Sequence, residues 1–495
     1  MQKADKNAVS SYRSLIIPLA LGQFICSYAA TNMNVAISAI AEDLGTTVNG
    51  IQVTITLFTL TMAAFMIPGS KLTDIWGRKV CFRIGLIVYG LGGLIATIAS
   101  SLGILTIGYS LLEGIGSALL IPPIYILLTV SFPDVKSRAK SFGIISAAAG
   151  IGAAAGPLIG GLITSAISWR ASFIVQVLVV LSIIILTKNI VDPGITGTKP
   201  RFDLLGAILS AAGLFFIVLG ILLSSTYGWF TAEEDFSIGN TVLIPQGGIS
   251  PVWVSVGIGA VILMLFFLHI RSRERHGKEP LISTHIFRNR TSNLGLVTQN
   301  VQWLIMQGSF FVISVFLQTI RGFNAISTGL ILTPTTIGIL VSSMAAKRLA
   351  HKYSQRTLIR GGFVLTTLGM ILLVWLAGAT SPIFNFVPGL LLMGLGIGIM
   401  LTSSVNIVQS AFPEKDQGEI SGLSRSVSNL GSALGTSIVG SVLLTTFLPQ
   451  TQTFGLALIT LVVIALAGLV AAILLPPDTA QSEKAATTGE LREET

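Results

Sequence analysis

Long apolar segments alternate with short polar stretches along almost the whole chain. About 20 apolar residues are needed for a helix to cross roughly 30 Å of hydrocarbon. Fourteen segments meet this length, and those near 49–69 and 420–446 carry the most Ser, Thr and Gly. The pattern therefore predicts an all-α polytopic membrane protein. We place the spans near residues 15–37, 49–69, 80–100, 103–127, 140–163, 169–189, 204–224, 252–270, 294–318, 326–346, 357–377, 384–408, 420–446 and 453–475.

The composition supports this reading and excludes a soluble globular protein. Of the 495 residues, 52% are hydrophobic and 10% charged, and the mean hydropathy is +0.82. With both termini inside, all 30 Lys and Arg residues except Arg170 and Arg321 fall on inner segments. This agrees with the positive-inside rule. Because the basic residues are scattered over eight segments, the net charge of +9 does not indicate a nucleic-acid partner.

The chain contains an internal repeat. Four glycines, Gly143, Gly152, Gly156 and Gly161, recur at a constant spacing of 279 residues, as from Gly161 to Gly440. The repeat relates spans 1–6 to spans 9–14, so spans 7 and 8 form an inserted hairpin. A duplicated helical bundle in a membrane is typical of secondary transporters, with the substrate site between the copies. We predict a cytoplasmic N-terminus (1–14), a six-helix bundle (15–189), a linker with two helices (190–293), a second six-helix bundle (294–475) and a disordered cytoplasmic tail (476–495).

The loop after the second span joins an acid, a glycine and basic residues in the segment 69–79. Asp74, Gly77 and Arg78 at a helix end can lock neighbouring helices through charge contacts and release them when the bundle moves. We predict a gating role for these three residues. The alternative is an ordinary basic loop.

The fifth span carries small residues at helical spacing, which let two helices approach closely, and a proline that bends the helix. We assign these residues a gating role as well, and the alternative is simple helix packing. They are Gly152, Gly156, Pro157, Gly160 and Gly161.

These segments resemble a known family. The 69–79 loop is similar to the signature between spans 2 and 3 of the major facilitator superfamily, and 152–161 resembles the antiporter motif of its drug exporters. Fourteen spans with a central hairpin are typical of its fourteen-helix drug/proton antiporters. Similar patterns stand at 202–206 and from 316 to 334.

The resemblance implies a major facilitator fold with a central cavity and alternating access. It implies a multidrug efflux protein of the cell (plasma) membrane that exports small hydrophobic or cationic substrates in exchange for protons. We expect a monomer in the lipid bilayer, no enzyme activity, no metal, and no cofactor besides the proton as coupling ion.

The chain departs from the family pattern at two charged positions. The usual acid of the first span falls at Ala29, and the usual Arg of the fourth-span motif is Ser110. Each charge would stabilise the other in a low-dielectric cavity, so losing both is easier than losing one. Proton coupling therefore does not follow from the resemblance alone.

Glu113 is the single carboxylate deep in any predicted span. An acid at that depth costs about 2.5–3.5 kcal/mol on insertion scales and usually faces a cavity. Burial favours its neutral form, which suits a carrier of protons or a counter-charge for a cation. We predict that Glu113 is the coupling site, with Arg425 as a candidate partner. The alternative is a protonated Glu that hydrogen-bonds to a neighbouring helix.

Two polar stripes are predicted to line the substrate cavity, because amides in lipid must face protein or water. One lies on the first span and the other on its repeat partner, the ninth. The alternative is hydrogen bonding between helices. The stripes contain Gln23, Asn32 and Asn34, and Gln299, Trp303 and Gln307.

A second functional reading stays open. The missing first-span acid favours a carrier that is uncoupled or differently coupled, for a narrower substrate such as a lipid or metabolite. A membrane enzyme or sensor has little support, since the chain contains no soluble domain or catalytic cluster.

Overall fold

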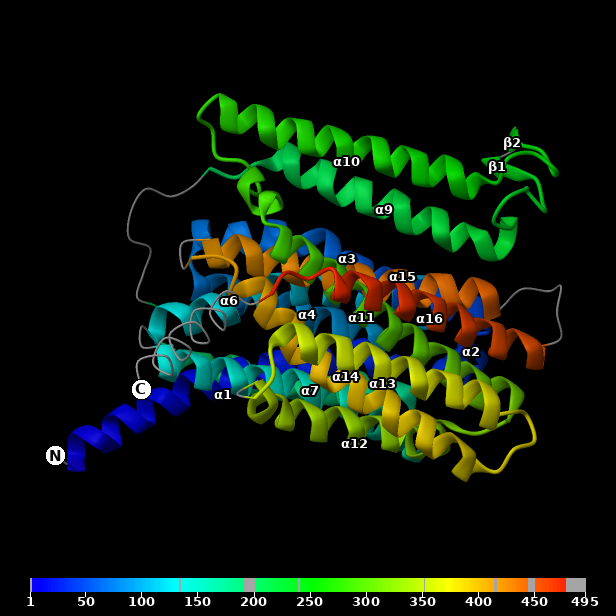
Figure 1. Ribbon diagram of the computed structural model, residues 1–495, viewed down its shortest axis with the longest axis horizontal. Helices are drawn as coiled ribbons and strands as arrows, with labels where there is room; N and C mark the ends of the chain where they lie inside the picture. The colour runs from blue at the N-terminus through cyan, green and yellow to red at the C-terminus, as the bar shows by residue number, and fades with distance from the viewer. Residues whose placement is uncertain are drawn as a thin grey trace, which may run out of the picture.

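Long helices make up almost all of the computed structural model, which describes residues 2–132, 135–190, 192, 201–238, 241–350, 352–413, 416–443 and 450–477 (Figure 1). The first half consists of α1 (Gln2–Asn32), η1 (Met33–Val35), α2 (Ile37–Asp43), α3 (Val48–Trp76), α4 (Arg78–Thr97), α5 (Leu102–Leu105), η2 (Thr106–Glu113), α6 (Gly114–Ser131), α7 (Val135–Ala166), α8 (Trp169–Leu186) and η3 (Thr187–Asn189).

The central hairpin and the second half follow. The hairpin consists of α9 (Leu204–Tyr227), β1 (Phe236–Ile238), β2 (Thr241–Ile244) and α10 (Pro251–Arg275), and β1 and β2 are antiparallel. The second half consists of η4 (Thr284–Arg288), α11 (Arg290–Val315), η5 (Phe316–Ile320), α12 (Ala325–Ala350), α13 (Gln355–Leu376), η6 (Ile383–Asn385), α14 (Phe386–Gln409), α15 (Gln417–Leu443) and α16 (Gln450–Ile473).

Thirteen helices among the described residues are long and apolar enough to cross a membrane. The segment predicted near 420–446 forms α15, which has 27 residues but is Ser-rich and too polar to meet the same criterion. Many of its serines are buried, and several hydrogen-bond to α11 or α3, for example Ser424 and Ser426. Helix α15 therefore does not need the apolar surface of a lipid-facing helix. The predicted tail lies almost wholly outside the described residues.

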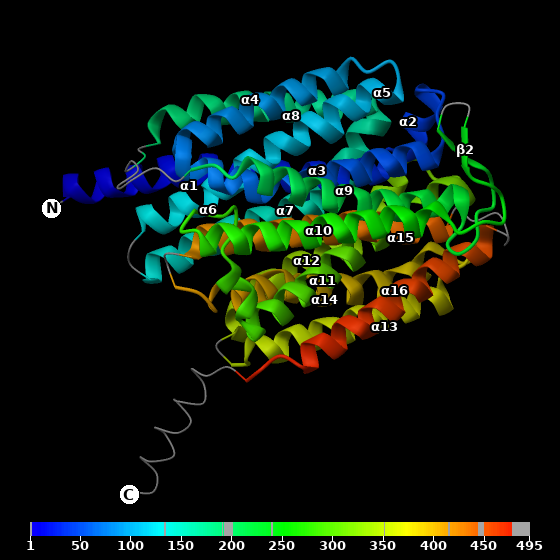
Figure 2. The same ribbon diagram turned by 90° about the horizontal axis from the view of Figure 1, so that it is seen from above.

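The two halves form two helical bundles that lie side by side, with the α9–α10 hairpin across them (Figure 2). Helix α9 packs on α3 of the first bundle and α15 of the second through a small apolar cluster. Helix α10 lies outside α9 (Figure 1). The hairpin thus covers the seam between α3 and α15. The cluster consists of Leu60, Leu214, Val218, Leu222 and Ala433.

Gly152 and its repeat Gly431 pack in equivalent places, as the duplication predicts. A methyl group added at Gly152 would collide with the carbonyl oxygen of Phe24 on α1, and one at Gly431 with that of Asn300 on α11. At Gly161 the methyl group would lie 2.5 Å from the carbonyl oxygen of Ala325 on α12. Helix α7 therefore contacts α1 and α12, and α15 correspondingly contacts α11 and α3.

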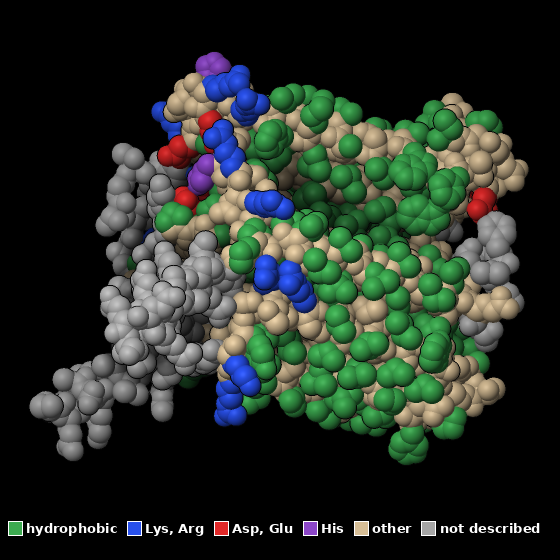
Figure 3. Space-filling model, viewed as in Figure 1, with side chains coloured by type: hydrophobic (Ala, Val, Ile, Leu, Met, Phe, Trp, Pro, Cys, Tyr) green, Lys and Arg blue, Asp and Glu red, His purple; other side chains and the backbone are tan. Residues whose placement is uncertain are grey.

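The two ends of the molecule differ in charge. Lys and Arg side chains gather at the end where the chain begins, here called the basic end, and hydrophobic side chains cover much of the surface between the ends (Figure 3). The two basic residues predicted to lie outside have partners at the opposite end. Arg170 pairs with Asp43 at 2.5 Å, and Arg321 donates to the carbonyl oxygen of Gly378 at 2.7 Å.

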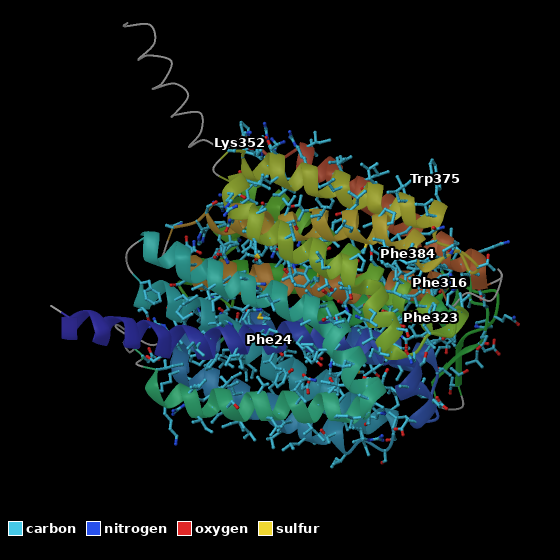
Figure 4. The ribbon with its side chains drawn as sticks, turned by 90° about the horizontal axis from the view of Figure 1, so that it is seen from below. Phe24, Phe316, Phe323, Lys352, Trp375 and Phe384 are labelled. Carbon is cyan, nitrogen blue, oxygen red and sulfur yellow. The ribbon has the colours of Figure 1, made fainter. Side chains whose placement is uncertain are left out.

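Aromatic residues mark the opposite end of the second bundle. Trp375 and Phe384 are 79% and 84% exposed, and they lie far along the bundle from Lys352 (Figure 4). Trp and Tyr are enriched where a membrane meets water, which suits the position of Trp375. Together with the apolar helices, this arrangement is that of a multi-pass membrane protein.

Candidate functional site

The loop between α3 and α4 lies against the start of α15 in the other bundle. Gly77 makes its tight turn at a φ of +98°, a conformation that favours glycine. The Ser70 hydroxyl donates to the carbonyl oxygen of Gly418 at 3.0 Å. Asp74 interacts electrostatically with Arg78 in its own loop and with Glu419 on α15. The predicted gating loop thus lies at a junction of the two bundles.

A second anchor holds the same loop to its own bundle. Arg78 lies 3.6 Å from the carboxylate of Asp192, and the backbone N–H of Lys79 donates to that carboxylate at 3.1 Å. The ammonium group of Lys79 also donates to the carbonyl oxygen of Lys188 at 3.3 Å. Arg78 therefore ties α4 to the chain after α8, while Ser70 and Asp74 face α15.

The small residues of α7 divide between two neighbours. Gly152, Gly156 and Gly160 face α1 of the same bundle, where a methyl group at Gly160 would lie 3.0 Å from Cβ of Asn32. Gly161 faces Ala325 on α12 of the other bundle, and Pro157 accommodates Gly329 of α12. The sequence grouped these residues, but only the last part of the motif lies between the bundles.

Glu113 is fully buried inside the first bundle. It is the last residue of η2, a π-helical segment, and such wide turns often occur at functional sites. Gly92 and Gly93 of α4 leave the room that the side chain occupies, since a methyl group at Gly92 would lie 2.9 Å from Cγ of Glu113. Neither carboxylate oxygen has a hydrogen-bond partner with acceptable geometry among the described residues.

The groups around Glu113 are polar but uncharged. Tyr89, Tyr109 and Cys26 lie near enough to interact with it electrostatically. Tyr89 donates its hydroxyl to the side-chain carbonyl of Gln176 at 2.6 Å. An ionised carboxylate would lack a compensating partner here, which makes burial of that charge costly.

The equivalent position in the second bundle contains an apolar residue. A methyl group at Gly92 would lie 2.7 Å from the backbone nitrogen of Glu113, and one at Gly369 would lie 2.5 Å from that of Met393. The two helix pairs therefore pack alike around a Glu in one half and a Met in the other. Packing alone does not require an acid at position 113.

The two positions that depart from the family pattern are both buried and hydrogen-bonded. The carbonyl oxygen of Ala29 accepts from the Tyr109 hydroxyl at 3.0 Å, and the Ser110 hydroxyl donates to the carbonyl oxygen of Thr54 at 2.7 Å. Arg425 does not reach Glu113. Its guanidinium group lies 4.7 Å from the ring centre of Tyr125 and donates to the Tyr125 hydroxyl.

Two of the predicted cavity residues of α1 bond mainly within the first bundle. The side-chain carbonyl of Gln23 accepts from the Tyr125 hydroxyl at 3.4 Å, and its amide donates to Ser27 at 3.3 Å. Asn32 donates to the Ser172 hydroxyl at 2.9 Å. Both side chains are buried. Sequence reasoning missed Tyr125, whose link to Gln23 and Arg425 joins α1, α6 and α15.

A different pair of contacts joins the bundles toward the opposite end. Gln318 donates to the carbonyl oxygen of Asn34 at 2.9 Å and accepts from the backbone N–H of Ser38 at 3.0 Å. Gln307 donates to the carbonyl oxygen of Ala30 at 2.9 Å. The α11–η5 segment is thus bonded to the segment from α1 to α2 there. Gln318 was part of the family resemblance but was not predicted as a site residue.

The remaining two residues of the α11 stripe have different surroundings. Gln299 is fully buried, donates to Ser428 at 2.8 Å and accepts from Ser424 at 2.9 Å. These are hydrogen bonds between helices, the alternative to a cavity-lining role for this residue. Trp303 keeps part of its surface exposed and packs against the apolar core.

Rings fill the edges of the bundle interior. Phe24 stacks on Tyr28 with ring centres 6.2 Å apart, and Phe316 stacks on Phe454 at 3.8 Å. In Figure 4, Phe24 lies toward the middle of the molecule, whereas Phe316 and Phe323 lie near its opposite end. The α11–η5 junction is therefore packed by aromatic side chains next to Gln318.

Comparison with known proteins agrees with this architecture. Residues 19–245 and 204–436 match the Major Facilitator Superfamily. The chain is 26% identical to the multidrug resistance protein Stp of Mycobacterium tuberculosis, over 86% of this chain and 75% of that protein. It is 28% identical to the puromycin resistance protein pur8 of Streptomyces alboniger, over 86% and 81% of the two chains.

A solved structure shows the same fold. The human organic anion transporter MFSD10 (TETRAN) is 13% identical, with a TM-score of 0.60 over 93% of this chain and 99% of that one. The family match spans most of the chain, and two bundles related by a repeat carry the structural likeness. The chain therefore belongs to the Major Facilitator Superfamily and is a multi-pass membrane transporter.

Proposed function

We propose that this transporter exports small hydrophobic or cationic compounds in exchange for protons, by alternating access of the space between its two bundles. Relatives named for multidrug resistance, puromycin resistance and cephamycin export support an efflux role. We place it in the cell membrane as a monomer, with both termini and the basic end in the cytoplasm, in agreement with the positive-inside rule. The proton is the single coupling ion in this proposal.

The observation that carries the proposal is the isolated carboxyl group of Glu113. It is fully buried, lacks a hydrogen-bond partner among the described residues, and stands where the other bundle has Met393. A group that costs energy to bury and that packing does not require is most simply explained by a role in binding a proton or cation. Glu113 is therefore our coupling residue.

The contacts between the two bundles are the ones that break and form again during transport in this proposal. The Asp74 loop separates from α15 when the basic end opens. The bonds of Gln307 to α1 and of Gln318 to η1 and α2 break when the opposite end opens. Gly161 and Pro157 form the seam with α12 about which the bundles move. The partly exposed Trp303 and the amide of Gln307 then line the space that substrate enters.

A carrier without proton coupling is the second candidate. The specific observation that favours it is the pair of replacements at Ala29 and Ser110, whose surroundings are satisfied without any charge. Such a carrier would move a narrower substrate, such as a lipid or metabolite, down its own gradient. It would use the same bundles but would not need Glu113.

Proteoliposomes that enclose a pH-sensitive dye distinguish the two candidates. We would impose a proton gradient, add lipophilic cations such as tetraphenylphosphonium, and follow lumenal pH for the wild type and Glu113→Gln. The matched control is Glu234→Gln, which changes an exposed acid in the hairpin loop. We expect substrate-dependent proton movement in the wild type and the control, and its loss in Glu113→Gln.

The opposite result is equally clear. Substrate movement without any change in pH, at the same rate in all three proteins, would contradict proton exchange and favour the uncoupled carrier. A failure of Glu113→Gln to fold is recognised from its thermal unfolding in detergent. Glu113→Asp, which keeps the carboxyl group, should then retain part of the proton movement.

A further inference from the structure

A second charged side chain lies inside the protein, on the face of α15 that looks toward the first bundle. The residues on either side of Arg425 fix its direction, because Ser424 bonds to Gln299 on α11 and Ser426 donates to the carbonyl oxygen of Ala63 on α3 at 2.6 Å. Arg425 therefore lies between these two helices and reaches Tyr125 on α6. It stands eight residues into α15, about 12 Å from the start of the helix.

The positive charge of Arg425 has no acidic partner among the described residues. No carboxylate oxygen there lies within ion-pair distance of its guanidinium group. Glu113 lies 12 residues from Tyr125 along the same helical rod, about 18 Å away. Glu419, on α15 itself, accepts from the backbone N–H and the hydroxyl of Ser283 at 2.8 and 3.2 Å.

Packing does not explain this arginine. At the repeat spacing of 279 residues, α7 has the small, uncharged Ser146 where α15 has Arg425. Both helices nevertheless make the same glycine contacts with α1 and α11. A partly buried cation without a counter-charge is costly, so a small uncharged residue would serve the fold better at position 425.

The contacts between Arg425 and Tyr125 leave part of the guanidinium group available to a ligand. Tyr125 stacks against its face and takes one N–H, and the other N–H donors have no partner among the described residues. Arg425 also keeps part of its surface exposed, as does Asn429 one turn further along the same helix. A planar guanidinium edge with free N–H groups matches the two oxygens of a carboxylate.

We propose that Arg425 and Tyr125 form the subsite for an anionic group of the substrate, a carboxylate or a similarly delocalised oxyanion, in an otherwise hydrophobic compound. This inference rests on the proposed export function and adds a preference, among its hydrophobic substrates, for compounds that carry such a group. The substrate anion supplies the counter-charge that Arg425 does not find among the described residues. Tyr125, which is buried, accepts one N–H of the guanidinium group and positions it, and the partly exposed part of Arg425 meets the substrate.

Rhodamine B and its ethyl ester provide the test, because the two dyes share one ring system and only rhodamine B has a free carboxylate. We would measure binding by fluorescence anisotropy with the full-length protein in detergent, and uptake into inverted proteoliposomes. We expect wild type to bind the acid about tenfold more tightly than the ester, the range of a hydrogen bond to a charged group. Arg425→Gln should bind both dyes alike, and Arg425→Lys should keep part of the preference.

Lys352→Gln is the matched control. It also removes one positive charge stacked on a tyrosine, here Tyr353 with 5.4 Å between Nζ and the ring centre, but on the exposed surface of the basic end. The control should keep the full preference for the acid. Thermal unfolding shows whether Arg425→Gln is folded, and the ester, whose binding should not change, reports the same in the binding assay.

Two outcomes would overturn the inference. Equal binding of acid and ester by the wild type, with transport of both, contradicts the anion subsite and leaves the exporter standing. A preference that survives in Arg425→Gln assigns the anion to another residue. If wild type transports neither these dyes nor any lipophilic cation, the proposed export function fails first, and the subsite fails with it.

Discussion

The seam between α7 and α12 should respond sharply to a single methyl group. We consider Gly161→Ala, at the point where α7 of the first bundle meets the start of α12 in the second. The added methyl group would lie 2.5 Å from the carbonyl oxygen of Ala325, whereas ordinary contact begins at 3.4 Å. Backbone at both sides of the contact cannot rotate away, so the helices must separate by about 0.9 Å.

The size of the effect follows from two opposing terms. Forcing an extra methyl group into a close-packed contact costs about 1–3 kcal/mol. Alanine in place of glycine stabilises a helix by roughly 0.5–1 kcal/mol. The net cost, about 1 kcal/mol when the middle of each range is taken, falls on those conformations in which the seam is closed. It should shift the ratio of seam-open to seam-closed molecules by about 5-fold.

Spin labels across the seam would measure this shift. Ile167, after the end of α7, and Leu330, on α12, are 76% and 57% exposed, so labels there need not disturb the core. Gly161→Ala should move the distance distribution between the labels toward longer values. Adding Gly329→Ala, which meets the carbonyl oxygen of Pro157 on the same seam, should add little, because one separation relieves both contacts.

Gly143→Ala is the control, since a methyl group there meets nothing within 4 Å. It should leave the label distances unchanged and raise stability slightly. If Gly161→Ala and Gly143→Ala give the same distance distribution, the seam does not take part in the motion, and α7 is merely a packing helix as the alternative reading holds.

Two further predictions concern buried polar contacts. Asp203 accepts from the backbone N–H groups of Gly206 and Leu281 and lies 2.9 Å from Nε2 of His269. Asp203→Ala should therefore destabilise the attachment of the hairpin by about 3 kcal/mol. Trypsin should cleave within 271–278 faster in this variant than in Glu234→Ala, and equal cleavage would contradict the prediction. Gln299→Leu should lower the thermal unfolding temperature, by about 1–3 kcal/mol in free energy of unfolding, without changing substrate affinity; reduced affinity at unchanged stability would instead place Gln299 in the cavity lining.

The contact between His269 and Asp203 could not be predicted from the sequence. His269 lies in the last part of the predicted span 252–270, next to a basic loop, which suggests solvent exposure. The structure instead places His269 against Asp203, which is 1% exposed. The pairing requires the fold to bring together two residues that are 66 positions apart in the chain. The local sequence contains no information on that approach.

The polar stripe on α11 shows a second limit of sequence reasoning. Gln299 and Gln307 are eight residues apart, and at 100° per residue their directions differ by about 80°. That angle is enough for Gln299 to bond to α15 and for Gln307 to bond to α1. Asn34 lies after the end of α1, in the 3-10 turn Met33–Val35, so the helical periodicity that would place it on the face of Gln23 does not extend to it.

The sequence by itself determined the all-helical membrane fold, the place of most long helices and the charge difference between the two ends (Figure 3), and its count of fourteen spans is close to the thirteen that meet the criterion among the described residues. It could do so because a chain in hydrocarbon must satisfy its backbone within each helix, so length and hydropathy suffice. The depth of Glu113 followed from the same reasoning.

Only the tertiary structure decided which polar groups meet. It buried Glu113 beside Gly92 with no hydrogen-bond partner among the described residues, split the glycine motif between α1 and α12, and placed Arg425 against Tyr125, 300 residues away in the chain. Such contacts depend on how two bundles are rotated against each other. That rotation is set by the sum of many close helix contacts, and no single segment of the sequence specifies it.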